Sequence, residues 1–186
     1  MFGNGLVLAV IARFKSLRTV PNLLIANLAL VDLLSAAINM PIHMIYTVLQ
    51  VTWYRGQLLA IITSFFSRLF VFLNLASMLA LLANMYFAIA FDLKYYVWKS
   101  NQKAVACSCL IWVTCTVLVV LSCIPLVNID LGDAPVTEYR REIFKQGKHF
   151  IAAGMAFCIT CGAVIGIMTN LSIKKKKKKE IGRAHV

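Results

Sequence analysis

Long apolar runs separated by short polar segments dominate the chain. A helix needs about 20 predominantly apolar residues to cross a bilayer, and four runs reach that length, at residues 22–48, 58–91, 104–126 and 150–173. A fifth run, residues 1–12, is too short to cross. We interpret it as the cytoplasmic end of a truncated helix. A signal peptide is the competing interpretation, and we set it aside because the run lacks a basic start and a small-residue cleavage site. The pattern predicts an all-α transmembrane helical bundle.

Basic residues sit at the ends of these runs and predict the orientation of the chain. Cytoplasmic loops carry an excess of Lys and Arg, and the basic clusters lie at residues 13–18, 94–103 and 174–179. The segments 49–57 and 127–148 are neutral or mixed in charge. We therefore expect a multi-pass protein of the plasma membrane, in contact with lipid, with its N-terminus outside. This distribution explains the net charge of +12, so no nucleic-acid partner is expected.

Composition supports the membrane assignment and narrows the chemistry. Apolar residues make up 61% and charged residues 14%, whereas soluble domains carry about 25% charged residues. All six cysteines lie within the apolar runs, which predicts packing roles, no extracellular disulfide and no metal site. The sequence shows neither a nucleophile paired with a base nor a glycine-rich phosphate loop, so we do not expect an enzyme. Gly162-x-x-x-Gly166 in the last run fits close helix packing.

Asp32 is the only charged residue between Leu23 and Thr47. A carboxylate near the centre of a bilayer costs at least about 2.5–3.5 kcal/mol. Such a side chain faces the interior of a helical bundle, where ionisable residues mark functional sites by default. We therefore expect the second run to contribute Asp32 to a site between helices.

Several short motifs follow one another along the chain in a characteristic order. They are Gly3-Asn4-x-x-Val7, Asn27-Leu28-Ala29-x-x-Asp32 with Pro41, Trp53-x-x-Gly56, Ala88-Ile89 with Leu93-Lys94-Tyr95, and Trp112 with Pro125. This order resembles that of rhodopsin-like (class A) G-protein-coupled receptors over residues 3–173. The resemblance implies a divergent, partial seven-helix receptor with about four and a half helices present, and with helices six and seven missing.

The resemblance implies an ion site at Asp32. In the family the matching acid binds sodium together with a polar residue of the third helix, at the position of Asn74. Carboxylate and amide oxygens suit a hard cation, and Asn4 can complete the cluster. A protonated Asp32 that hydrogen-bonds Asn4 and Asn74 as packing glue is the alternative. Asn27, Ser77 and Trp112 resemble the family's polar trio that joins three helices, and we assign them a structural role.

Four residues are candidates for an outer ligand pocket. Ser67 stands where amine receptors of the family carry aspartate, so a biogenic amine is not expected as the ligand. Arg68 can hold a carboxylate or phosphate in bidentate fashion; alternatively it snorkels outward or pairs with Glu138 or Glu142. His43 and Tyr46 complete the set. The identity of the extracellular ligand stays open.

The inner end of the third run departs from the family. Asn84-Met85-Tyr86 replaces Asp-Arg-Tyr, whose arginine contacts the G protein and latches the inactive state in the family. Leu93 belongs to the same coupling region, and Asp92 replaces a proline. Both cysteines of the family's outer disulfide are absent, one of them at Ala60.

Three functions remain after this sequence analysis. The first is a receptor that senses an extracellular ligand and signals through a heterotrimeric G protein. The second is a non-coupling decoy or dimer partner, which Met85 and Asp92 favour. The third is a solute transporter that uses Asp32 and Arg68 as intramembrane charges, although internal repeats of the kind that transporters often show are not evident.

Residues 174–186 form a basic tail of uncertain origin. Six lysines precede Glu180, and residues 181–186 back-translate to ATC-GGA-AGA-GCA-CAC-GTC, which looks like a common sequencing-adapter sequence. One interpretation is therefore a transcript read through an A-rich stretch into adapter. The other is a genuine basic cytoplasmic loop.

Overall fold

The computed structural model describes residues 1–48, 57–91, 100–127 and 136–184. In these ranges the chain forms helices and no strand. They are α1 (Phe2–Arg13), the short 3-10 helix η1 (Lys15–Leu17), α2 (Val20–Val48), α3 (Gln57–Ala90), α5 (Asn101–Val127) and α6 (Val136–Ala184). Within the described residues, four stretches are long and apolar enough to cross a membrane: Val20–Ile42, Ile61–Ala90, Asn101–Ile124 and Gly154–Lys174. The predicted all-α bundle is confirmed.

The last helix is longer than the apolar run that predicts it. The run covers residues 150–173, whereas α6 begins at Val136 and continues to Ala184. Both extensions are rich in Glu, Arg, Lys and Gln, which are good helix formers even where they are not buried. The apolar residues therefore define the part of α6 that can lie in lipid, and the helix propensity of the flanking polar residues extends the helix at both ends.

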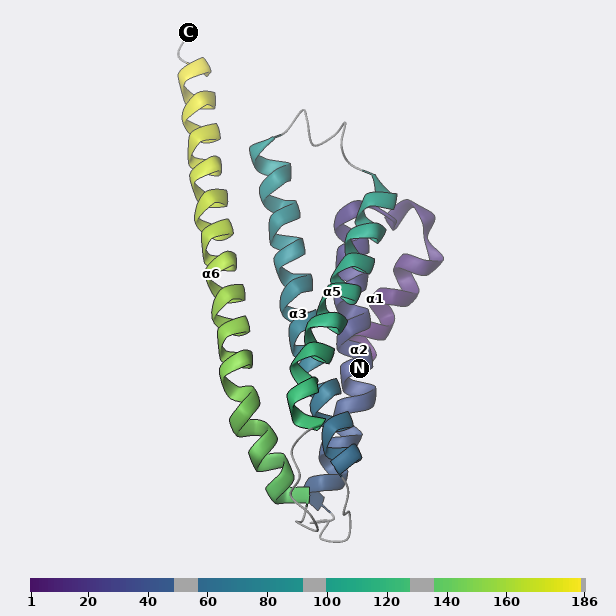
Figure 1. The fold of residues 1–186 in the computed structure, drawn as a ribbon. Helices are drawn as coiled ribbons and strands as arrows, with labels where there is room; N and C mark the ends of the chain where they lie inside the picture. Colours follow the sequence, from purple (N-terminus) through teal and green to yellow (C-terminus); the bar gives the residue numbers. More distant parts are fainter. Residues whose placement is uncertain (49–56, 92–99, 128–135, 185–186) are drawn as a thin grey trace.

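Helix α3 occupies the middle of the bundle (Figure 1). It packs against α2, α5 and α6, while α1 packs mainly on α2. The buried core lies where α2, α3 and α5 meet, and Val31, Leu73 and Val119 are its fully buried apolar side chains. Many large apolar side chains on the outside remain exposed, for example Leu110 and Leu121 on α5. Lipid is the natural surrounding for such a surface.

Glycines set how closely α6 approaches α3. A Cβ atom at Gly154 would lie 2.7 Å from Cζ of Phe72 and closer still to its neighbouring ring carbon, so no larger residue fits without a shift. At Gly162 a Cβ would make ordinary contacts with Leu79 and Leu82, and at Gly166 no described atom lies within 4 Å. Of the predicted Gly162-x-x-x-Gly166 pattern, Gly162 therefore packs against α3, whereas among the described residues no neighbouring helix lies against Gly166.

Candidate functional site

Asp32 lies at the junction of three helices. Asn74 Nδ2 on α3 donates a hydrogen bond of 2.6 Å to Asp32 Oδ1, and Asn4 Nδ2 on α1 donates one of 3.2 Å to Oδ2. Each carboxylate oxygen thus accepts one amide, and the side chain is half-buried. The structure brings together the three residues expected to form the ion site.

The chemistry of this cluster suits a small hard cation. Asp32 retains lone pairs beyond the two that the amides use. Rotating either amide group about its terminal bond would present a carbonyl oxygen in place of the N–H. One carboxylate and two amide oxygens from three helices are ligands that hard cations prefer. The same hydrogen bonds are equally compatible with an Asp32 that only holds the three helices together and binds no ion.

A second polar cluster joins α2, α3 and α5. Trp112 Nε1 donates to Asn27 Oδ1 at 2.9 Å, and Asn27 Nδ2 donates to Ser77 Oγ at 2.8 Å. Asn27 is 8% exposed and Ser77 is 1% exposed. Because buried amide and indole groups need partners, Asn27 is the hub on which the other two depend. The predicted trio is therefore assembled in the structure.

Arg68 turns toward α5 rather than outward. It is only 5% exposed, and its Nη1 lies 3.4 Å from both the carbonyl oxygen and Oγ of Ser122. The snorkelling interpretation is therefore wrong. The side chains of Glu138 and Glu142 lie outside the described residues, so the pairing alternative stays a prediction.

The other pocket candidates are only partly placed. Ser67 is half-buried on α3 next to Arg68. His43 and Tyr46 lie in the last two turns of α2, but their side chains are outside the described part of the chain. The predicted four-residue ligand pocket thus stays a prediction.

The C-terminal end of α3 carries a cluster of three aromatic rings. The ring centroid of Tyr86 lies 5.6 Å from that of Phe87 and 6.3 Å from that of Phe91, and the Phe87 and Phe91 centroids are 6.0 Å apart. Met85 beside them is 54% exposed, and Asn84 is half-buried. Leu93 lies outside the described residues. The sequence analysis missed this cluster, although the spacing of Phe87 and Phe91 is that of neighbours on a helix.

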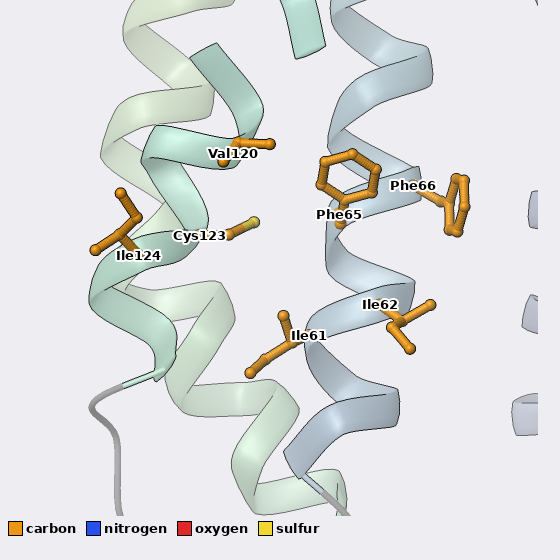
Figure 2. Close-up of a pocket in the computed structure, with 7 residues that line it drawn as sticks. All are labelled: Ile61, Ile62, Phe65, Phe66, Val120, Cys123 and Ile124. Carbon is orange, nitrogen blue, oxygen red and sulfur yellow. The ribbon is translucent and has the colours of Figure 1, made fainter. Parts of the chain in front are cut away.

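An apolar groove runs between the N-terminal part of α3 and the C-terminal part of α5 (Figure 2). Its volume is about 280 Å³, and its seven lining residues are Ile61, Ile62, Phe65, Phe66, Val120, Cys123 and Ile124. In Figure 2 the Val120 and Cys123 side chains point from α5 toward α3, and Ile61 points toward α5. Sequence analysis did not predict the groove, because it depends on how the two helices lie against each other.

Comparison with known proteins identifies the family. A family model described as "7 transmembrane receptor (rhodopsin family)" matches residues 3–130, which is more than half of the chain. The chain belongs to the rhodopsin family of seven-transmembrane receptors. This match confirms the family that the motif order suggested. Both polar clusters lie within the matched residues.

Among similar curated proteins are prokineticin receptors. Prokineticin receptor 2 of Rattus norvegicus is 31% identical over 121 residues, which are 64% of this chain and 31% of that protein. Prokineticin receptor 1 of Bos taurus is 34% identical over 112 residues, 60% of this chain and 28% of that receptor. Prokineticin receptor 2 of Homo sapiens is 37% identical over 93 residues, 50% of this chain and 24% of that receptor. The matched segments thus span less than a third of these relatives.

Proposed function

We propose that this chain forms part of a G-protein-coupled receptor of the plasma membrane, with its N-terminus outside, that senses an extracellular ligand. Family membership and the two polar clusters support the proposal. One cluster joins α1, α2 and α3 through Asp32, and the other joins α2, α3 and α5 through Asn27. A ligand that binds one arrangement of these helices better than another shifts the population of receptor states. Helix α3 takes part in both clusters and carries such a shift from the outer to the inner side.

The relatives suggest the class of ligand. They are named receptors for prokineticin, and Ser67 supplies no acid for an amine ligand. We therefore propose a prokineticin-type ligand rather than a biogenic amine. The test is G-protein activation in cells that express the complete coding sequence containing this chain, using a panel of Gα biosensors. A response to prokineticin with none to amines supports the proposal, and a response to amines alone overturns the ligand assignment.

Met85 favours a second candidate, a relative that binds ligand without coupling to G protein. A thioether side chain, 54% exposed at the inner end of α3, can neither form an ion pair nor donate a hydrogen bond. Met85→Arg is expected to raise ligand-evoked G-protein activation about tenfold or more, the equivalent of one charge-assisted hydrogen bond. Activation is measured with the same biosensors at matched surface expression.

Met85→Leu is the matched control, because it preserves size and apolarity. It should leave activation unchanged. If the unaltered receptor already activates G protein as strongly as Met85→Arg, then coupling does not need an arginine here and the decoy candidate is refuted. If neither protein activates any Gα while both bind labelled ligand, the decoy candidate replaces the signalling one.

We also propose that a sodium ion binds at Asp32. Asp32→Asn removes the negative charge and retains an amide that can hydrogen-bond Asn4 and Asn74. In the unaltered protein, 150 mM NaCl should raise the melting temperature above that in 150 mM KCl, because an ion that binds only the folded state stabilises it. Asp32→Asn should abolish the difference. Equal melting temperatures in the two salts for the unaltered protein would favour the packing-glue alternative.

A further inference from the structure

Two of the six cysteines face outward near the start of α5. Cys107 and Cys109 are exposed, whereas Cys115 and Cys123 further along the same helix are buried and belong to the apolar core. The two cysteines of α6 are half-buried. The expected packing role therefore fits the buried pair on α5 and does not account for the exposed pair.

The start of α5 lies at the inner side of the membrane in the orientation proposed above. Asn101 Nδ2 donates a hydrogen bond of 2.6 Å to the carbonyl oxygen of Arg18, which ties the first residue of α5 to the basic segment between α1 and α2. Lys103 is exposed one turn before Cys107, and lysines at the ends of spans keep their ammonium groups in water. At 1.5 Å per residue, Cys107 and Cys109 lie about 6 and 9 Å further along the helix than Lys103. Both thiols are thus close to the boundary between lipid headgroups and acyl chains.

An apolar surface leads from these thiols toward the middle of the membrane. Leu110 lies one turn after Cys107, and Val113 lies one turn after Cys109; both of these apolar side chains are exposed. Both belong to the candidate span Asn101–Ile124. A hydrocarbon chain attached to either sulfur would therefore lie along α5 in the acyl region of the bilayer, where it stays out of water.

We propose that Cys107 and Cys109 are S-acylated by a long-chain fatty acid. Cysteines next to the membrane surface are the usual acceptors of this reversible modification. In the overall reaction the cysteine sulfur attacks the thioester carbonyl of a long-chain acyl-coenzyme A. A new sulfur–carbon bond forms, the sulfur–carbon bond of the donor breaks, and coenzyme A leaves as a thiol with the proton that the cysteine gave up.

The proposal rests on the proposed orientation of the chain, because acyl-coenzyme A is a donor on the cytoplasmic side. It is independent of the extracellular ligand and of G-protein coupling. An epitope tag at the N-terminus measures the orientation separately, through antibody binding to intact and to permeabilised cells.

The test is thioester exchange on the full chain expressed in cells. Free thiols are blocked, thioesters are cleaved with neutral hydroxylamine, and the released thiols are labelled and assigned to positions by mass spectrometry. Label that depends on hydroxylamine should appear at Cys107 and Cys109, and about tenfold less of it at Cys115 and Cys123, because buried thiols are inert. The double variant Cys107→Ala with Cys109→Ala should lose incorporation of an alkynyl fatty acid into α5.

The double variant Cys115→Ala with Cys123→Ala is the matched control, because it removes two thiols from the same helix and keeps the exposed pair. It should leave the label at Cys107 and Cys109 unchanged. Equal label at the buried pair in the unaltered chain would overturn the proposal.

The tag separates failure of this inference from failure of the orientation. Free thiols at both exposed positions, together with a tag that antibody reaches on intact cells, would overturn the acylation alone and leave the pair as small lipid-facing residues. A tag that is reached only after permeabilisation would refute the orientation and the acylation together.

Discussion

Replacing Asn27 by leucine is expected to destabilise the folded protein by about 2–4 kcal/mol, the cost of leaving two buried partners without their hydrogen bonds. Asn27 accepts from Trp112 and donates to Ser77, which is almost completely buried. Leucine has the same number and branching of side-chain heavy atoms but offers neither a donor nor an acceptor. The indole N–H and the serine hydroxyl then face an apolar neighbour, and α2, α3 and α5 lose their common link. The measurement is the melting temperature of the purified protein in detergent, together with its level at the cell surface.

Asn39→Leu is the matched control for this substitution. Asn39 lies on the same helix and is half-buried, but its described hydrogen bond, 3.4 Å long, goes to Ser35 one turn away on α2 itself. Its loss should lower stability by less than about 1 kcal/mol. A melting temperature for Asn27→Leu equal to that of Asn39→Leu would mean that the trio is not an interhelical link. Double-mutant cycles of Asn27 with Trp112 would then show no coupling energy.

The second large effect is expected at Gly154, where valine should destabilise the contact between α3 and α6 by about 1–3 kcal/mol through overpacking. The added side chain would overlap the ring of Phe72, so either the ring must turn away or α6 must move outward. Gly166→Val on the same helix should have little effect, because no described atom lies near its Cβ position. Thermal unfolding of both variants and of the unaltered protein measures the difference.

The double variant Gly154→Val with Phe72→Ala tests the cause. Removing the ring leaves room for the valine, so the two changes together should cost less than the sum of their separate costs. Additive losses would instead attribute the effect of Gly154→Val to the backbone of α6 rather than to its packing on α3. A Gly166→Val variant as unstable as Gly154→Val would contradict the predicted packing face altogether.

The amino-acid sequence determined the helices of the fold because each membrane-crossing helix can be recognised from its own apolar run. An uninterrupted apolar run of sufficient length has one viable structure in lipid, since every backbone polar group must be satisfied within the segment. The four spans follow from this rule. The start and end of α6 do not, because polar helix-forming residues extend that helix beyond its apolar run. Asp32 and Asn27 stood out for a related reason, as polar groups that an apolar run tolerates only when they find partners.

Only the tertiary structure decided what these helices present to one another. Whether Arg68 reaches outward or turns to Ser122 depends on where α5 lies, which no local pattern encodes. Gly154 and Gly166 are the same residue type in the same apolar run, yet of the two only Gly154 faces Phe72. The α3–α5 groove likewise depends on how these two helices lie against each other, because its lining residues come from both. Periodicity and hydrophobicity are properties of one helix, whereas packing and recesses depend on the relative rotation and distance of two.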